Sequence, residues 1–436
     1  MAEEYFTEEM TGDELKSMLK SSINLKAGDG VAEPRLNLSP EDMKWWMDAR
    51  VGFFIHWGLY SIPAQGEWVM HNNNIPAGEY AKLAMEFRPE HADMEEWAAI
   101  ARDAGAKYSV FVTRHHDGFA MWDSKSSYQN YTTAKTAAGR DFVKEYLEAF
   151  RSRGLKAGLY YSPMDWRFPG YFRPTELREN AELMKKQCYG QITELMSEYG
   201  EISVLWYDGS WLSHKGSDSD AAWLWEPVKL NEIVRKYQPK AVINPRSGMV
   251  GDFRCDEGGH DITGQIIPFP WEKGFTLGRA WGYTTDETAM PAERVISLIV
   301  NAAVRNGNTI INVGPDRNGK IPDSIRTVLH EVGVWLKENG ESIYSTRGGP
   351  FQPVDYVYGS TYREDVIYLH ILDGEKFEKE MLPPLKQNVI GCSLLNGEEV
   401  DVVQDKAGIK LAKIPKSCGA GDIIVKLKLD SAVDNL

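Results

Sequence analysis

From Asp93 onward, short apolar runs alternate regularly with segments of helical spacing, and this alternation constrains the fold more than any other feature of the sequence. The first pair is a helix over 94–104, ending at Gly105, and a strand over 107–113. Strands that alternate with helices of this size form a parallel sheet, and this many units favour a closed barrel over an open sheet. We therefore predict an α/β fold with a (β/α)8-like barrel.

The remaining units follow the same pattern, with apolar strands that break at polar residues and helices that stop at glycine or proline. We expect strands at 51–58, 155–162, 202–208, 241–244 and 309–313, and helices at 141–152, 176–199, 223–237, 293–305 and 323–339. Two segments interrupt this order: an irregular loop over 61–87 and a loop-rich insert over 249–290.

The two ends of the chain differ from this central part. Residues 1–40 read as an N-terminal arm, with helical spacing over 3–20. Beyond Tyr344, short alternating runs at 366–371, 400–403 and 423–429 predict a small antiparallel β-sandwich. We predict a catalytic barrel with its arm over 1–344 and a C-terminal β-sandwich over 345–436.

The run from Ile202 to Trp211 reads as a buried strand that stops at the carboxylate of Asp208 and then at Gly209. Because side chains alternate along a strand, Val204, Trp206 and Asp208 share one face, and Leu205 and Tyr207 share the other. A lone Asp-Gly pair is most often a turn. Here other polar residues also stand at strand ends, and a barrel would gather them at one rim.

These residues are His56, the pair His115 and His116, Tyr160 and Arg246. A single histidine on an apolar strand is more often a hydrogen-bonded core residue than a ligand. Tryptophan is mostly buried anywhere, so core packing remains an equal interpretation for Trp206 and Trp281. Six polar residues at strand ends are nevertheless hard to explain by packing alone.

The composition narrows the class of ligand. A formal charge of −14 argues against nucleic acid and against an anionic membrane surface as partners. No run approaches the about 18 apolar residues of a membrane-spanning helix. The 14 Trp and 20 Tyr offer flat faces that suit a neutral sugar ring, although most must be core. An oligomer is left open.

Neither the cysteines nor the N-terminal residues identify the cellular compartment of the protein. The four cysteines, Cys188, Cys255, Cys392 and Cys418, are widely spaced, so we expect free thiols. Residues 1–24 are acidic and lack a basic segment followed by an apolar core, so no signal peptide is visible. Secreted, periplasmic and cytoplasmic locations all remain open.

Glycoside hydrolysis needs two carboxyl groups, and Asp208 at a rigid strand end suits the one that attacks or steers water. The second, a proton donor, must be brought across by a loop. Glu257, in a Gly-flanked segment, is the first candidate, and Glu272 is the second. Glu67 and Asp256 are the further candidates.

Two other functions are consistent with these residues. A metal-dependent barrel hydrolase would use His56, His115 and His116 as ligands, but the chain has no His-x-His or His-Glu-x-x-His pattern. A sugar-binding protein could keep the pocket without catalysis, although the presence of both Asp208 and Glu257 argues against it.

Six blocks, in order along the chain, resemble the α-L-fucosidases of glycoside hydrolase family 29. They are Phe54-Ile-His-Trp-Gly58, Gly66-Glu-Trp68, His115-His-Asp-Gly-Phe119, Gly158-Leu-Tyr-Tyr-Ser162, Leu205-Trp-Tyr-Asp-Gly209 and Trp281-Gly-Tyr283. The resemblance implies a barrel with a C-terminal β-sandwich, no metal and no organic cofactor. It also implies a retaining exo-α-L-fucosidase that acts by double displacement on fucosylated oligosaccharides or glycoconjugates.

The resemblance assigns roles position by position. Asp208 matches the family's nucleophile. Glu257 matches its acid/base within Asp252-Phe-Arg-Cys-Asp-Glu257, where the family usually resembles Asp-Phe-x-Thr-Pro-Glu. The Trp-Glu block at Glu272 is also typical of the family and remains the runner-up. The fucose pocket would be lined by His56, Glu67, Trp68, His115, His116, Tyr160, Trp206, Arg246 and Trp281.

Overall fold

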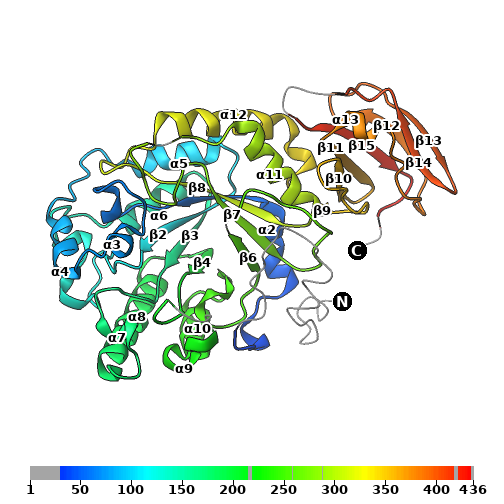
Figure 1. Cartoon of the computed structure of the whole chain (residues 1–436). Coiled ribbons are helices and arrows are strands. Elements are labelled where there is room, and N and C mark those ends of the chain that lie inside the picture. The colour runs from blue at the N-terminus through cyan, green and yellow to red at the C-terminus, as the bar shows by residue number, and fades with distance from the viewer. Residues whose placement is uncertain (1–29, 215–218, 258, 287, 417–420, 434–436) are drawn as a thin grey trace.

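The structure is a computed structural model that describes residues 30–214, 219–257, 259–286, 288–416 and 421–433. Its centre is a curled sheet of eight parallel strands in the order β5-β4-β3-β2-β1-β8-β7-β6 (Figure 1). The strands are β1 (Val51–Ile55), β2 (Tyr108–Arg114), β3 (Lys156–Tyr161), β4 (Val204–Tyr207), β5 (Val242–Ile243), β6 (Arg254–Glu257), β7 (Trp271–Thr276) and β8 (Asn308–Val313). The predicted barrel-like α/β fold is confirmed.

The two end strands of this sheet, β5 and β6, are joined through Asp252 rather than by a strand ladder. Its backbone N–H donates to the Ile243 carbonyl at 2.7 Å, and its Oδ2 accepts from the Ile243 N–H at 2.8 Å. The same carboxylate pairs with Arg235 at 2.8 Å. A buried side chain thus closes the curl where both strands are short.

Helices surround the sheet on its outer face (Figure 1). Asp93 and Asp141 cap α5 and α6 by accepting hydrogen bonds from backbone N–H groups of the first turn. The main helices are α2 (Pro40–Ala49), α5 (Met94–Asp103), α6 (Phe142–Ser152), α8 (Arg178–Glu198), α10 (Pro227–Tyr237), α11 (Ala292–Val304) and α12 (Asp323–Asn339). All of those from α5 onward match predicted segments within a few residues, and the helix expected over 3–20 lies outside the described residues.

The alternation predicted for the run to Asp208 is confirmed. Val204 and Trp206 belong to the core inside the curled sheet, which also holds Tyr108 and Tyr160. Leu205 and Tyr207 belong to the larger core between sheet and helices. The inner face therefore leads directly to the carboxyl edge of the sheet.

The prediction of one continuous helix over 223–237 is wrong in part, because the structure divides this helical segment into two helices. The first, α9, spans Ala222–Trp225, and α10 begins at Pro227. Glu226 between them has φ +46°. Proline disfavours the α conformation in the residue before it, so the chain turns at this position.

The loop-rich interpretation of 249–290 is also wrong in part, because β6 and β7 lie within it. Asp256 and Lys273, on their outward faces, form an ion pair at 2.8 Å with both side chains 1% exposed. Two buried charges break the apolar pattern that would have identified these strands. The expected irregular loop over 61–87 contains short helices instead, namely η3 (Leu59–Ser61), α3 (Val69–Asn72), α4 (Ala77–Tyr80) and η4 (Ala81–Met85).

The C-terminal part is the predicted antiparallel β-structure. A five-stranded sheet, in the order β12-β15-β11-β10-β9, shares one core with the hairpin of β13 and β14. The strands are β9 (Arg347–Gly348), β10 (Tyr358–Arg363), β11 (Val366–Ile371), β12 (Val389–Leu394), β13 (Asp401–Asp405), β14 (Gly408–Ala412) and β15 (Ile423–Leu429). The division of the chain at 344/345 stays a prediction.

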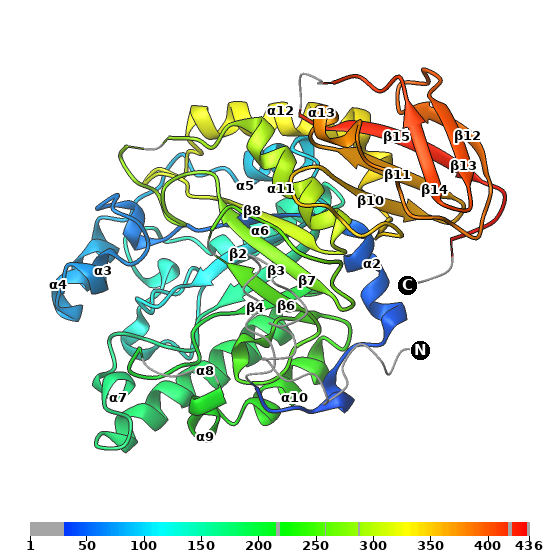
Figure 2. The ribbon, with the colours of Figure 1, turned by 45° about the vertical axis from the view of Figure 1, so that its right-hand side comes forward.

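This β-domain lies beside α11 and α12, as both views show (Figures 1 and 2). Tyr368 and Ile424 pack into the core that surrounds the barrel. The hydroxyl of Thr361 donates to the Ser342 carbonyl at 2.6 Å. The contact is on the outer helical layer.

Three of the four cysteines, Cys188, Cys255 and Cys392, are free thiols as expected, and Cys418 lies outside the described residues. Within the part of the chain that the structure describes, no helix has the length and apolar character needed to cross a bilayer.

Candidate active site

A cavity of about 540 Å³, counted with its open mouth, lies at the carboxyl edge of the sheet. The predicted site residues line it with the exception of His116, which lies just behind Asp208. Its lining is Phe54, His56, Glu67, Trp68, His115, Tyr160, Trp206, Asp208, Trp211, Arg246, Glu257 and Trp281.

Asp208 follows the end of β4 and is held by three neighbours. The Tyr160 hydroxyl donates to its Oδ2 at 2.8 Å, Nη1 of Arg246 donates to its Oδ1 at 2.8 Å, and Nε2 of His116 lies 3.4 Å from Oδ2. Burial opposes the charge on this carboxyl, but these contacts outweigh it and hold the pKa of Asp208 well below its usual range. Asp208 is therefore ionised and aimed into the cavity.

Glycine is required directly after this carboxylate. Gly209 has φ +74°, and a Cβ there would meet the Met164 methyl group at 2.0 Å and Cε1 of His116 at 3.2 Å. The positive φ of Gly209 and its close approach to these two side chains leave no room for another residue directly after Asp208.

Glu257 ends β6 on the inner face of the sheet. Nη2 of Arg246 donates to its Oε2 at 2.8 Å, so one guanidinium contacts both Glu257 and Asp208. The Glu257 side chain is 26% exposed, and that of Asp208 is 15% exposed. Two carboxyl groups of different accessibility face each other across a single arginine.

The other acidic candidates lie elsewhere or are already engaged. Glu67 lines the cavity, and its Oε2 accepts a hydrogen bond from the Gly282 N–H at 2.9 Å. Glu272 is buried inside the barrel beneath the cavity, where it accepts a hydrogen bond from Trp206. Asp256 points outward to its ion pair with Lys273.

His56 is neutral and presents an acceptor. Nδ1 of His56 lies 2.6 Å from Oδ1 of Asn312, whose Nδ2 donates to the Trp281 carbonyl at 2.7 Å. The asparagine oxygen must therefore accept, so Nδ1 carries the proton of the imidazole. Burial lowers the pKa of His56 to about 3. Its Nε2 is left with a free lone pair.

His115 is also neutral. Burial, with His116 and His56 adding to it, lowers the pKa of His115 well below its usual value. Its ring stacks on that of Tyr160 with centroids 5.9 Å apart. Among the residues that the structure describes, Nδ1 of His115 is buried and has no hydrogen-bond partner, whereas buried polar atoms normally have one.

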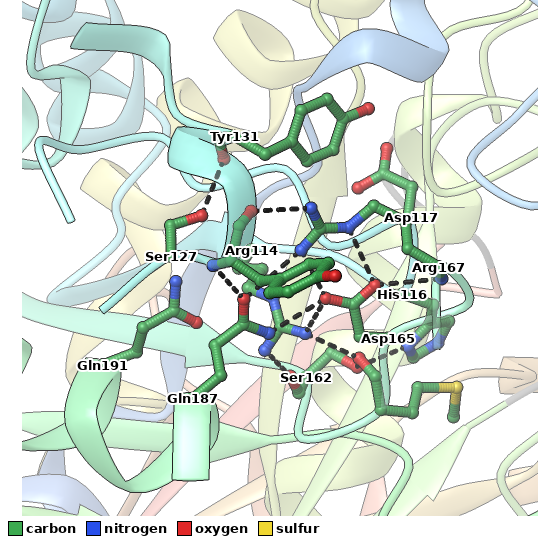
Figure 3. A network of polar contacts seen from close by, with 12 residues as sticks. Arg114, His116, Asp117, Ser127, Tyr131, Ser162, Asp165, Arg167, Gln187 and Gln191 are labelled. Atoms are coloured by element: carbon green, nitrogen blue, oxygen red, sulfur yellow. Dashed lines mark hydrogen bonds and ion pairs between the residues drawn. The ribbon is translucent and has the colours of Figure 1, made fainter. Parts of the chain in front are cut away.

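His116 is oriented by a polar network beneath the cavity (Figure 3). Its Nδ1 lies 2.7 Å from Oγ of Ser162, whose hydroxyl donates to the Met164 carbonyl at 3.1 Å. This contact with Ser162 fixes the imidazole ring and turns its Nε2 towards Asp208. A second-layer serine thus fixes the ring that touches the carboxylate.

The same network holds the ends of β2 and β3 together. Asp165 is fully buried and pairs with Arg114 at 3.0 Å and with Arg167 at 2.6 Å. The Arg114 guanidinium also donates to the Ser162 carbonyl at 2.9 Å and to the Tyr161 hydroxyl at 2.5 Å. Figure 3 shows these side chains converging between His116 and α8. Such a buried network of ion pairs and hydrogen bonds rigidifies the loop that carries Ser162.

Aromatic rings form the walls of the cavity. The rings of Tyr160 and Trp206 stack with centroids 6.0 Å apart, and the Arg246 guanidinium lies 5.2 Å from the centre of the Trp206 ring. Two wall residues, Phe54 and Trp211, were not predicted from the sequence. Phe54 stands two residues before His56 on the same strand face, a spacing that could have identified it.

This arrangement suits a small neutral polyol. Neutral imidazoles, a guanidinium and carboxylates can each bond a hydroxyl group, and indoles can cover an apolar ring face. Among the described residues, no group of three or more His, Cys, Asp or Glu side chains is arranged to hold a metal ion. An ionised carboxylate and a second carboxyl group opposite it can carry out acid-assisted displacement at one carbon.

Comparison with known proteins places this geometry in context. A family model described as alpha-L-fucosidase matches residues 32–341. The plasma alpha-L-fucosidase of Rattus norvegicus is 31% identical over 338 residues, which are 69% of this chain and 70% of that protein.

Solved structures agree. Alpha-L-fucosidase isoenzyme 1 from Paenibacillus thiaminolyticus superposes with a TM-score of 0.79 at 32% identity, covering 90% of this chain and 99% of the other. An alpha-L-fucosidase from Bacteroides thetaiotaomicron, trapped as a covalent intermediate with 2-fluoro-fucosyl fluoride, gives a TM-score of 0.81 at 25% identity and covers 94% and 100%. These similarities favour neither a metal-dependent hydrolase nor a binding protein without activity.

Proposed function

The chain belongs to the α-L-fucosidase family and is a retaining glycoside hydrolase, and we propose that Asp208 is its nucleophile and Glu257 its general acid and base. The observation that carries this assignment is the shared contact of both carboxyl groups with Arg246 inside one cavity. An ionised group and a second, more exposed group at close range meet the needs of double displacement.

In the first step, an oxygen of Asp208 attacks the anomeric carbon of the bound fucosyl residue. The bond to the leaving oxygen breaks, and Glu257 gives its proton to that oxygen. In the second step, Glu257 takes a proton from water, and the resulting hydroxide displaces Asp208. Two inversions at one carbon release fucose with its original configuration.

The wall residues bind the sugar. The free lone pair on Nε2 of His56 accepts a hydrogen bond from a ring hydroxyl, and His115 and Glu67 offer further partners. Trp68, Trp206 and Trp281 cover the apolar face and the methyl group. His116 acts from behind Asp208 and holds its carboxylate in place.

Terminal α-L-fucosyl groups of oligosaccharides or glycoconjugates are the proposed substrates. A net charge of −14 argues against nucleic acid as a partner, because phosphates would be repelled. Neutral glycans meet no such barrier.

Rescue by an external nucleophile separates Glu257 from Glu272. In Glu257→Gly, hydrolysis of an aryl α-L-fucoside with a good leaving group should stall at the covalent intermediate, and added azide should restore turnover by attacking that intermediate. Glu272→Gly is the matched variant, and azide should not restore it. Rescue of Glu272→Gly alone would reverse the assignment.

A further inference from the structure

Glu272 is a buried carboxyl group for which the two chemical steps have no use. It lies on β7, beside Cys255 of β6, and is 2% exposed. Burial, the largest effect, raises its pKa to about 7, and the charge of Glu257 adds to this rise. A carboxyl group is costly to bury, so its retention in the core needs a reason.

Both oxygens of Glu272 are engaged, each by a different ring. Oε1 accepts from Nε1 of Trp206 at 3.0 Å, and Oε2 accepts from the Tyr108 hydroxyl. Trp206 reaches the cavity, whereas Tyr108 packs deeper in the inner core, against Trp46 of α2. The carboxyl group therefore joins the floor of the cavity to the barrel interior.

The indole that Glu272 holds supports the groups proposed to react. The Trp206 ring stacks on Tyr160, whose hydroxyl donates a hydrogen bond to Asp208. The Arg246 guanidinium also lies over the Trp206 ring, and it pairs with both Asp208 and Glu257. A rotation of this indole would displace both supports at once.

We propose that Glu272 is a positioning residue for the hydrolytic reaction: its hydrogen bond locks the Trp206 indole and thereby places Arg246 and Tyr160 against the two reacting carboxyl groups. This inference rests on the proposed roles of Asp208 and Glu257. It assigns Glu272 no contact with substrate. Misplacement of reacting groups by about 1 Å can cost on the order of 100-fold in rate, so such a lock has a measurable effect.

The test compares two replacements of Glu272 with a control variant of Tyr108, the other residue that donates to the Glu272 carboxyl group. Glu272→Gln keeps an oxygen that accepts from Nε1 of Trp206, and Glu272→Leu has none. Tyr108→Phe removes the other hydrogen bond and leaves Trp206 untouched. Each variant is assayed with two aryl α-L-fucosides, one with a good and one with a poor leaving group, and its thermal unfolding midpoint is measured.

We expect kcat/KM of Glu272→Gln and of Tyr108→Phe to stay within about threefold of the wild-type value. Glu272→Leu should lose on the order of 30-fold or more even on the good leaving group, because a misplaced Asp208 slows attack whatever the leaving group. Glu272→Met is the second apolar variant should Glu272→Leu not fold. In a Trp206→Phe background, which has no indole N–H, Glu272→Leu should cost no further activity.

The inference would be overturned by a folded apolar variant with kcat/KM within threefold of wild type, or by a loss in Tyr108→Phe equal to that in Glu272→Leu. A further loss in the Trp206→Phe background would also overturn it. A wrong assignment of the general acid would give a different pattern of activity. If Glu272 were itself the acid, its variants, Glu272→Gln included, would lose far more activity on the poor leaving group than on the good one.

Discussion

Asp208 and Glu257 are joined through one guanidinium, whose Nη1 lies 2.8 Å from Oδ1 of Asp208 and whose Nη2 lies 2.8 Å from Oε2 of Glu257. Because the fork of Arg246 is planar and rigid, it sets how far apart the two carboxyl groups stand. Retaining glycosidases hold this pair about 5 Å apart, closer than inverting ones do. A shared arginine is a direct way to maintain a short spacing.

Arg246→Lys should therefore impair catalysis although it keeps the charge. An ammonium group is a point charge and cannot make the two parallel contacts of the fork. We expect kcat/KM for an aryl α-L-fucoside to fall on the order of 100-fold, about 2.7 kcal/mol of barrier. The control is Arg326→Lys, in an ion pair with Glu96 on the outer helices. Activity of Arg246→Lys within twofold of wild type would refute the role of the fork.

Tyr160→Phe isolates one hydrogen bond to the proposed nucleophile. The ring and its stacking on Trp206 remain, and only the donor to Oδ2 of Asp208 is lost. A hydrogen bond to a charged group contributes about 1.5–3 kcal/mol, so kcat should drop roughly 10- to 100-fold. A kcat of Tyr160→Phe within threefold of the wild-type value would contradict this account.

The sequence predicted most of the barrel because its strands and helices follow simple periodicities. It failed at β6 and β7, where Asp256 and Lys273 stand at outward positions that are usually apolar. The two residues are far apart in the sequence, and they pair only because β6 and β7 are neighbours in the folded sheet. The break at Glu226 was missed for a different reason: helical spacing continues across Pro227, although the local backbone cannot.

The buried ion pair of Asp256 and Lys273 should contribute to the stability of the fold. Lys273→Met leaves the buried carboxylate of Asp256 without its ammonium partner, and breaking a buried pair in this way costs about 3–5 kcal/mol. The double variant Lys273→Met with Asp256→Leu should recover most of this loss. Chemical denaturation monitored by tryptophan fluorescence measures both. Lys320→Met, in the exposed pair with Asp323, should change stability little. A single variant as stable as this control would contradict the prediction.

The candidate site was easier to predict than the strands, because polar residues at strand ends are visible in one dimension. His56, Tyr160, Asp208 and Arg246 were predicted in this way, and all four line the cavity. The sequence does not show which of Glu257 and Glu272 is the more exposed, because both lie in the same insert, on β6 and β7. Only the fold shows that the first faces the cavity and the second lies beneath Trp206.

Asp117, behind the histidine pair, should make stability depend on pH. Burial raises the pKa of this carboxyl group to about 6, against 3.8 for the ordinary group. Its contribution is complete below about pH 4 and is lost as the pH rises through 6. Relative to Asp117→Asn, the wild type should lose about 2.4 kcal/mol between pH 4 and pH 7. Unfolding free energies at both pH values test this, with the exposed Asp286→Asn as control. A difference that is independent of pH would contradict it.

The central claim is that Asp208 forms a covalent bond to the sugar. The most direct measurement is mass spectrometry of the protein after incubation with 2-fluoro-fucosyl fluoride, followed by peptide mapping of the adduct. The account predicts one added 2-fluoro-fucosyl group per chain, located on the peptide that carries Asp208 and absent from Asp208→Asn. An adduct on any other residue, or full hydrolysis by Asp208→Asn of an aryl α-L-fucoside, would contradict it.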